Sequence, residues 1–380
     1  MSSELSALLS AVKKRDRTDK YSVLSAMYAI GAHKTPVLAK KVREVLALEL
    51  GSEAPDNVNV WLRRCKGLIQ PVEKGPPIQW ALTEKGIGEL RRQSGMQLLD
   101  ESAAYSSDVG IVCALEDPEF IAVMNAFGGP NQWTEAGSSR FNHVYRTTEL
   151  TTKAGAKLKV VGTTASSMGL TAAAIVTTQL LLQFRPRIVI MIGIAAGTRG
   201  GKKQFGDVLV ADPSVDYNSG KVVSSDGIRE FLPDPYPIGL NPRLRSLLLR
   251  YSAGHPAFDA IRGRWRGKTP AGKNRLFLGP LGAADQVIDD ETRVLEIQRN
   301  WRKLIGVEME TYAVYRACHE APEPRPRFVS FKAVCDFAAE KGDSWQSYAA
   351  FTAAEFAAEF LKAEWNALWP APQNHEKTKI

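Results

Sequence analysis

The sequence has few cysteines and no long apolar run. Its 4 cysteines are scattered through 380 residues without the short spacings of metal ligands, so we expect neither a metal nor another cofactor. No segment reaches the roughly 18 apolar residues of a membrane span. The N-terminal segment also lacks the apolar core of a signal peptide. These absences predict a cytoplasmic protein without a membrane partner.

What is present is the composition of an ordinary globular protein, with 44% hydrophobic and 24% charged residues. A chain of 380 residues is longer than the roughly 250–300 residues that one hydrophobic core usually serves, so we expect two domains. The formal net charge of +8 permits an anionic partner, although it is modest for a chain of this length.

The first part of the chain favours short helices followed by a hairpin. Apolar residues recur at helical spacing in 21–32, 36–50 and 57–68. Two extended runs within 69–82 flank a Lys-Gly-Pro-Pro turn, and Thr83 is suited to cap a further helix. This element order resembles a winged helix-turn-helix with its third helix in the recognition position. We therefore predict a winged-helix-like domain over 1–95 and a polar linker over 96–107.

From Asp108 onward, strand-like apolar runs alternate with helical ones, which predicts an α/β fold with helices covering a sheet. The expected strands are 108–115, 157–164, 187–194, 207–211 and 327–335. The expected helices are 169–184, 290–301, 310–320 and 344–365. Residues 213–275 are rich in Pro, Gly and Arg and predict an irregular excursion with one helix near 241–251. We assign 108–370 to this domain and 371–380 to a polar tail.

Four segments of the second domain carry its chemistry. They are GIVCALEDPEF (110–120), IGIAAG (192–197), GVEMETYA (306–313) and KAVCDFA (332–338). One such segment would be weak evidence, but four in this order and at compatible spacing are specific. They resemble the 5′-methylthioadenosine/S-adenosylhomocysteine nucleosidase branch of the nucleoside phosphorylase superfamily over nearly all of 108–365. The resemblance implies a mixed sheet flanked by helices, a homo-oligomer and hydrolysis of the bond between adenine and ribose.

The resemblance also implies a role for each of several residues in this reaction. Asp336 matches the general acid that protonates N7 of adenine as the glycosidic bond lengthens. Glu310 matches the carboxylate that accepts hydrogen bonds from the ribose hydroxyls and stabilises oxocarbenium charge. Met309 packs on the sugar and Glu308 has a supporting role. Without the rest of the motif, Glu310 would be explained as a carboxylate at a helix N-terminus.

The third carboxylate role, accepting a proton from the attacking water, has two candidates. The first segment contains Glu116, Asp117 and Glu119. The family's glutamate aligns with Pro118, and one extra residue in the loop brings Glu119 into register. The apolar residues that follow then continue a helix. We favour Glu119 and keep Glu116 as the alternative.

Substrate-binding positions follow from the same resemblance. Gly193 and Ala195 lie in the small-residue loop beside the ribose, and Lys332, which opens the fourth segment, is assigned to the same set. Counting back from the third segment locates the adenine-binding loop. Its residues are Asp285, Gln286, Val287 and Ile288. Val287 stands where the family often has an aromatic ring, which leaves the identity of the purine open.

Water is favoured over phosphate as the nucleophile. Phosphorolysis needs guanidinium groups and backbone N–H donors gathered on an anion. The phosphorylases' arginine has no counterpart in the first segment. Arg199, Lys202 and Lys203 follow the second segment. They form either a solvated turn or a site for a 5′-phosphate chain, which would make the substrate AMP or ATP.

Basic residues of the first domain predict a nucleic-acid partner, with protein docking as the alternative. They are Lys40, Lys41 and Arg43 on the second expected helix and Arg63, Arg64 and Lys66 on the third. The fusion resembles toxic nucleosidase effectors of bacterial antiviral defence, in which a sensor domain restrains an enzyme that depletes adenine nucleotides. The rival hypothesis is a nucleic-acid-binding regulator that senses a purine nucleoside without cleaving it. Retention of all three carboxylate roles argues against that rival.

Overall fold

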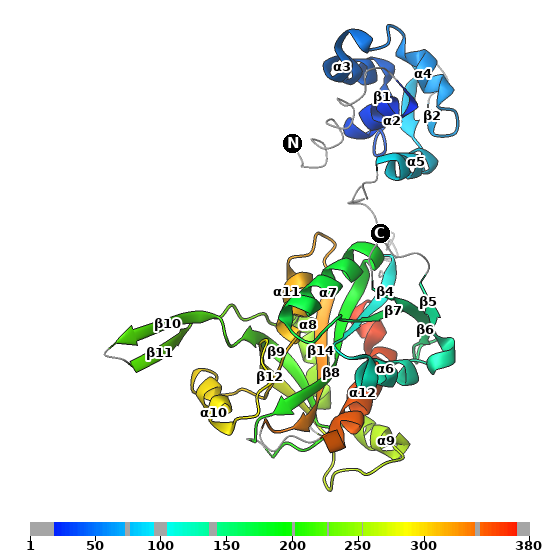
Figure 1. Cartoon of the computed structure of the whole chain (residues 1–380). Coiled ribbons are helices and arrows are strands. Elements are labelled where there is room, and N and C mark those ends of the chain that lie inside the picture. The colour runs from blue at the N-terminus through cyan, green and yellow to red at the C-terminus, as the bar shows by residue number, and fades with distance from the viewer. Residues whose placement is uncertain are drawn as a thin grey trace, which may run out of the picture. The chain divides into compact units, whose positions relative to one another are not determined.

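The computed structural model describes residues 19–72, 77–94, 105–136, 143–199, 202–225, 228–252, 254–338 and 343–370. The chain divides into two compact units, 1–102 and 103–380, which we call the N-terminal and C-terminal units (Figure 1). The predicted tail 371–380 and most of the predicted linker lie outside the described residues. No helix in the described parts is long and apolar enough to span a bilayer.

The N-terminal unit is a small helical core with a three-stranded sheet. Its helices are α2 (Lys20–Ala29), α3 (Ala39–Leu50), α4 (Val58–Arg64) and α5 (Glu84–Ser94), with the short turn η1 (Gly51–Glu53). Its strands, in sheet order, are β1 (Val37–Leu38), β3 (Gln79–Leu82) and β2 (Ile69–Pro71). The predicted hairpin is confirmed, since Ile69 pairs with Leu82 in antiparallel register. Thr83 caps α5 as predicted, because its Oγ1 accepts the Gly86 N–H at 3.1 Å.

The C-terminal unit is built on a mixed nine-stranded sheet. In sheet order the strands are β13 (Gly306–Glu308), β12 (Leu276–Ala283), β9 (Val208–Asp216), β14 (Arg327–Asp336), β8 (Pro186–Gly197), β4 (Ser107–Cys113), β7 (Lys157–Thr164), β6 (Arg146–Thr151) and β5 (Thr134–Glu135). Strands β4, β8 and β14 run parallel, whereas β9 is antiparallel to β14. Strand β13 also pairs with β8, so five strands close into a ring.

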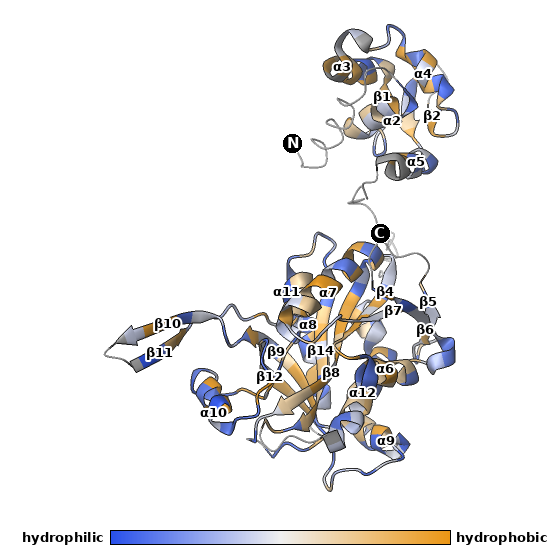
Figure 2. Cartoon of the chain, in the orientation of Figure 1, coloured by the Kyte–Doolittle hydropathy of each residue, from blue (hydrophilic) through white to orange (hydrophobic). Residues whose placement is uncertain are grey.

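Helices cover both faces of this sheet (Figure 1). The described helices of this unit are α6 (Ile121–Ala126), α7 (Leu170–Phe184), α8 (Pro242–Leu248), α9 (Ala257–Arg264), α10 (Glu291–Asn300), α11 (Thr311–His319) and α12 (Gln346–Leu368). Because successive strand residues point to opposite faces, β8 serves two cores. Ile188 and Ile190 pack in the core with α6 and α12, whereas Val189 and Met191 pack in the core with α7 and α11. Figure 2 shows this apolar centre.

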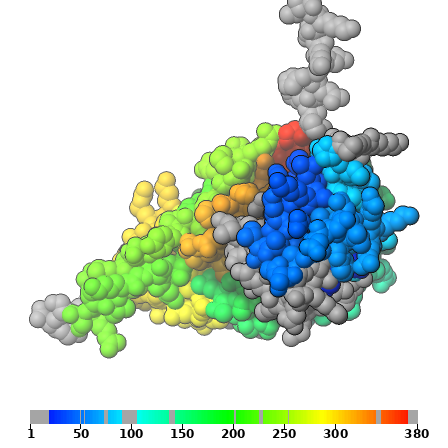
Figure 3. All heavy atoms as spheres, turned by 90° about the horizontal axis from the view of Figure 1, so that it is seen from above, coloured from blue at the N-terminus to red at the C-terminus, as the bar shows by residue number. Residues whose placement is uncertain are grey.

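The helix predicted near 241–251 is confirmed as α8. The rest of the prediction for 213–275 was wrong, because the segment also contains the end of β9, the hairpin β10 (Gly220–Ser225) and β11 (Ile228–Pro233), and the helix α9. Figure 1 shows the hairpin extending away from the sheet, and in Figure 3 it projects from the surface of the C-terminal unit. The overlooked signal was Asp226-Gly227 between two extended runs, a dipeptide typical of hairpins. Strands β5, β6, β12 and β13 were also not predicted; β12 contains Gly and Pro, which weaken the strand pattern.

Candidate active site

The four sequence segments meet at a cavity of about 280 Å³. Residues at or just beyond the ends of β4, β8, β13 and β14 line it, together with the loop before α10 and the starts of α7 and α12. The lining residues are Ala114, Leu115, Glu119, Met168, Ile194, Ala195, Ala196, Gln286, Val287, Ile288, Val307, Glu308, Met309, Glu310, Cys335, Asp336 and Gln346. Most of this wall is apolar, with a few convergent carboxylates, which is typical of small-molecule sites.

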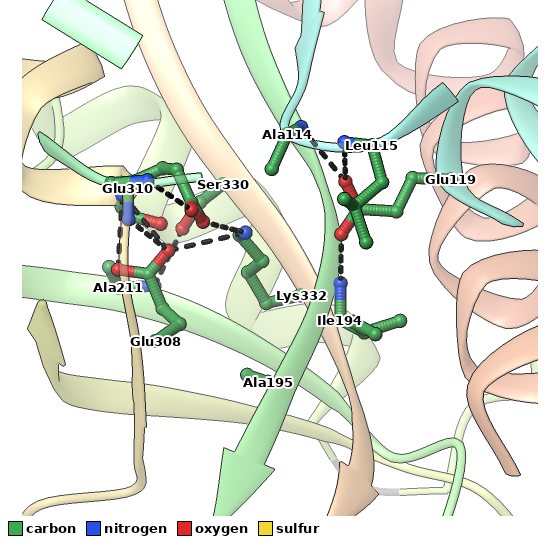
Figure 4. A network of polar contacts seen from close by, with 12 residues as sticks. Ala114, Leu115, Glu119, Ile194, Ala195, Ala211, Glu308, Glu310, Ser330 and Lys332 are labelled. Atoms are coloured by element: carbon green, nitrogen blue, oxygen red, sulfur yellow. Dashed lines mark hydrogen bonds and ion pairs between the residues drawn. The ribbon is translucent and has the colours of Figure 1, made fainter. Parts of the chain in front are cut away.

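Glu119 lies in this cavity with both carboxylate oxygens held by backbone donors. Its Oε2 accepts the N–H groups of Ala114 at 2.8 Å and Leu115 at 2.9 Å, and its Oε1 accepts the Ile194 N–H at 2.9 Å (Figure 4). The residue is only 1% exposed. Burial raises the pKa of Glu119 above its usual range, Lys332 opposes the shift and Glu310 adds to it. A buried, fixed carboxylate of raised pKa is suited to exchange protons.

Glu116, the alternative candidate, lies outside the cavity. Its side chain is 47% exposed and forms an ion pair with Arg146 Nη1 at 3.0 Å. Glu116 and Glu119 both lie in the segment η2 (Glu116–Phe120), which leads into α6. The structure therefore brings Glu119 to the other carboxylates and leaves Glu116 on the surface.

Glu310 and Glu308 share one buried cation. Lys332 Nζ lies 2.9 Å from Glu310 Oε2 and 3.2 Å from Glu308 Oε2, and Lys332 is 1% exposed (Figure 4). Burial alone would lower the pKa of Lys332, but the three surrounding carboxylates outweigh it and raise the pKa above its usual range. Lys332 is not among the cavity-lining residues. Its ammonium contacts Glu308 and Glu310 and neutralises these carboxylates from behind the cavity wall, whereas the sequence had predicted a substrate-binding residue.

Glu308 and Glu310 have different surroundings. The Glu308 carboxylate accepts the N–H groups of Glu310 and Thr311 at 3.0 Å, at the positive end of the α11 dipole. Burial raises the pKa of Glu308 even though Lys332 opposes the shift. Glu310 binds Lys332 through Oε2 and accepts the Gly169 N–H at 3.0 Å through Oε1. Glu308 therefore stabilises the turn that presents Glu310.

Asp336 is the last residue of β14 and is half-buried at the cavity wall. Its Oδ1 accepts the Ala338 N–H at 2.7 Å, and the Cys335 thiol donates to its Oδ2 at 3.4 Å. Ala338 has a φ of 58°, a left-handed conformation that is costly for a residue other than glycine. The turn after β14 is therefore strained where it orients the Asp336 carboxylate.

Part of the predicted adenine loop lines the cavity, and part of it contacts the start of α7. Val287 and Ile288 line the cavity, and Val287 is 61% exposed. Asp285 does not line it; instead its Oδ1 accepts the Leu170 N–H at 2.5 Å, at the start of α7. The lining residues Met168 and Gln346 were not predicted from the sequence. Their only signal was their place at the starts of two expected helices.

The basic run after β8 does not line the cavity. Arg199 Nε lies 3.7 Å from Glu291. Lys203 Nζ donates to Thr198 Oγ1 at 3.1 Å and lies over the Phe277 ring. Lys202 is exposed. None of these three described residues lines the cavity, and a site for a 5′-phosphate chain stays a prediction.

Gly193 lies directly behind the Glu119 carboxylate. A Cβ at this position would overlap Glu119 Oε1 and lie 3.1 Å from Lys332 Nζ. We expect Gly193→Ala to lower the free energy of unfolding by about 1–3 kcal/mol through overpacking. If Glu119 is needed for turnover, displacing its carboxylate by about 1 Å should also cost about 10²-fold in kcat.

Gly263→Ala is the matched control for this glycine, because Gly263 lies in α9 with open space around its Cβ position. Thermal melting and steady-state kinetics of both variants check the prediction. Unchanged turnover in Gly193→Ala would show that the carboxylate position is not critical.

The mixed sheet, closed at β13 and carrying a carboxylate-lined cavity at its strand ends, defines an α/β domain with the nucleoside phosphorylase fold, as predicted. Residues 108–363 match the family described as the phosphorylase superfamily, and the chain belongs to this superfamily.

Three relatives show the range of this similarity. An uncharacterised protein of Sinorhizobium fredii is 31% identical over 66% of this chain and 60% of its own length. The Escherichia coli protein named ATP nucleosidase Cap17 is 26% identical over 75% of this chain and 56% of its own length. The chain thus spans 60% or less of these two relatives. The solved 5′-methylthioadenosine/S-adenosylhomocysteine nucleosidase of Helicobacter pylori is 19% identical, with a TM-score of 0.51 over 68% of this chain and 99% of its own, which shows the shared fold.

Proposed function

We propose that the C-terminal unit is a hydrolytic adenine nucleosidase. The observation that carries this proposal is the meeting of Glu119, Glu310 and Asp336, from three separate segments, around one cavity. Breaking an N-glycosidic bond needs a proton for the leaving base, a negative charge beside the sugar and a base for water. Each of these three tasks has one carboxylate available.

In this mechanism Asp336 donates a proton to N7 of the base as the C1′–N9 bond breaks. The electron pair of that bond stays with the base, which leaves as neutral adenine. Glu310 accepts hydrogen bonds from the ribose hydroxyls, and its charge stabilises the oxocarbenium-like sugar. Lys332 holds the Glu310 carboxylate in place through the contact of its Nζ with Glu310 Oε2. Met309, which lines the cavity, packs on the sugar.

Glu119 then activates the nucleophile. Water attacks C1′ from the face opposite the base, and its proton passes to Glu119, which leaves a sugar with a hydroxyl at C1′. Three backbone N–H bonds prevent this carboxylate from rotating. Fixed geometry of this kind removes part of the entropic barrier.

Water rather than phosphate is the proposed nucleophile because the described cavity wall contains no lysine or arginine. The nearest buried cation, Lys332, is already occupied by Glu310 and Glu308. A phosphate ion would need guanidinium or ammonium donors of its own.

The test is incubation of the full chain with adenosine, methylthioadenosine, AMP and ATP, with chromatographic detection of free adenine. Phosphate-independent release of adenine from at least one of them is expected. A relative named ATP nucleosidase supports including nucleotides. Binding without adenine release would favour the rival function, a regulator that senses a purine nucleoside. Release only in the presence of phosphate would make the enzyme a phosphorylase.

For the N-terminal unit we propose a winged helix-turn-helix that binds nucleic acid. Support comes from its element order and from basic side chains, all exposed, on and after two consecutive helices. They are Lys40, Lys41 and Arg43 on α3 and Arg63, Arg64 and Lys66 on and after α4. Such residues are placed to neutralise phosphates.

We expect charge reversal of Arg63, Arg64 and Lys66 to glutamate to weaken nucleic-acid binding and flatten its salt dependence. Each lost phosphate contact should reduce the slope of log K against log salt by about 0.9 on duplex DNA. Fluorescence anisotropy across a salt series measures both effects. Lys85→Glu, on the exposed surface of α5, is the control. Equal binding by reversed and wild-type chains at every salt concentration would favour protein docking.

We also propose that the whole chain acts in the cytoplasm as a nucleotide-depleting effector of antiviral defence. The support is the joining of a separate compact unit to a nucleosidase-like unit. Measurement of adenine nucleotide pools in phage-challenged bacteria that express the wild type or Asp336→Asn tests this. Equal pools in the two strains would contradict it.

A further inference from the structure

The first turn of α7 binds two carboxylates that come from distant segments. The Gly169 N–H donates to Glu310 Oε1 at 3.0 Å, and the next N–H, of Leu170, donates to Asp285 Oδ1 at 2.5 Å. The helix has no side-chain cap of its own, since the residue before it is glycine. The positive end of its dipole therefore favours both carboxylates.

These two carboxylates lie beside different parts of the cavity. Asp285 directly precedes the cavity-lining residues Gln286, Val287 and Ile288, whereas Glu310 lines the cavity itself. Consecutive backbone groups of α7 thus connect the loop assigned to the base with the carboxylate assigned to the ribose. Asp285 does not itself line the cavity, so this connection is its route to the residues that do.

The connection tolerates little displacement. Gly169 has a φ of 114°, which side chains rarely permit, and a Cβ there would overlap Asp285 Oδ1. The backbone of α7 is therefore in direct contact with the Asp285 carboxylate. A shift of Asp285 moves the Gly169 N–H, and with it the oxygen of Glu310 that this group holds.

We propose that Asp285 is a positioning residue. Through the Gly169–Leu170 backbone it fixes the position of the Glu310 carboxylate relative to the base-binding loop. This inference rests on the proposed nucleosidase function. It revises the earlier expectation that Asp285 contacts the substrate.

Three substitutions separate this role from that of a simple helix cap. Asp285→Ala removes the acceptor. Asp285→Glu keeps a negative charge at the N-terminus of α7 but lengthens the side chain. It therefore retains the capping charge and changes the distance between the loop and the first turn of α7. Asp285→Asn keeps an oxygen at the Oδ1 position and should restore most of the function. Asp289→Ala, which removes another exposed carboxylate from the same loop, is the control.

The measurement compares each ribosyl substrate that the wild type cleaves with its 2′-deoxy form, for example adenosine with 2′-deoxyadenosine. Asp285→Ala and Asp285→Glu should each lose about tenfold in kcat on the ribosyl substrate, the value of one charge-assisted hydrogen bond at the low end of its range. KM should change little. The loss in kcat should be smaller on the deoxy substrate, which lacks one hydroxyl for Glu310 to hold. The ratio of kcat on the ribosyl substrate to kcat on the deoxy substrate should therefore fall.

Two results would overturn the inference. One is a kcat for Asp285→Ala and Asp285→Glu equal to that of Asp289→Ala. The other is an equal loss on both sugars, which a purely structural cap would produce. Absence of adenine release by the wild type from every substrate would instead contradict the proposed function. Thermal melting of each variant shows whether it is folded before its kinetics are compared.

Discussion

Asp336→Asn is expected to lower adenine release by about 10²–10⁴-fold, the usual value of general acid catalysis. An amide cannot deliver a proton to N7 at neutral pH, so the base would have to leave as an anion. The fold should be retained, because the asparagine oxygen can still accept the Ala338 N–H that now binds Asp336 Oδ1. Single-turnover chromatography of adenine measures the rate, and thermal melting measures the stability.

Asp259→Asn is a suitable control for this substitution. Asp259 is a half-exposed carboxylate on α9 that pairs with Lys273 at the surface. Its loss should leave turnover unchanged. Near-normal turnover by Asp336→Asn would remove this aspartate from the mechanism and require another acid beside the base.

Glu119→Gln is expected to reduce turnover by a comparable factor of about 10²–10⁴. The amide cannot take a proton from water. It also turns an NH₂ group toward backbone N–H groups that now donate to a carboxylate. An unsatisfied buried polar group costs about 1–3 kcal/mol, so we expect the melting temperature to fall as well.

Glu116→Gln is the matched comparison, because Glu116 belongs to the same segment but lies on the surface. The exposed pair with Arg146 is worth about 0–1 kcal/mol, and its loss should leave turnover near the wild-type value. Full activity in Glu119→Gln with a collapse in Glu116→Gln would falsify our assignment of the water-activating base.

The pH profile provides a second measurement on the same pair. Burial raises the pKa of Glu119, and only its ionised form can accept a proton from water. Turnover should therefore fall as the pH drops through that raised pKa, at a higher pH than for an exposed glutamate. The acid limb should persist in Glu116→Gln. Its persistence in Glu119→Gln would mean that another group produces it.

The sequence predicted the parts of the fold that have a strong local pattern. Strands β7, β8 and β14 and helices α7, α11 and α12 lie close to their predicted ranges, because long apolar runs and helical spacing are properties of neighbouring residues. The prediction failed for β12 and for the β10–β11 hairpin. Glycine and proline interrupt the first, and few of the hairpin's side chains are buried, so little apolar periodicity marked it.

Within the site, the sequence pointed to the carboxylates but not to all of their contacts. The sequence favoured Glu119 but left Glu116 as an alternative, because the choice depended on one residue of loop register. Lys332 and Asp285 were assigned to the substrate, whereas the structure places Lys332 behind Glu310 and Asp285 against the first turn of α7. Nothing local in a sequence states which way a side chain at a strand end or in a loop points.

By itself the sequence determined which chemical groups this protein possesses and which faces of its strands and helices are apolar, since both follow from residue types and their spacing. Only the tertiary structure decided which carboxylates converge and which cation neutralises them. The bonds that hold Glu119 to Ile194 and Glu310 to Gly169 join residues 75 and 141 positions apart. Such contacts depend on strand order and on the closure of the sheet, which are properties of the whole folded chain and of no single segment.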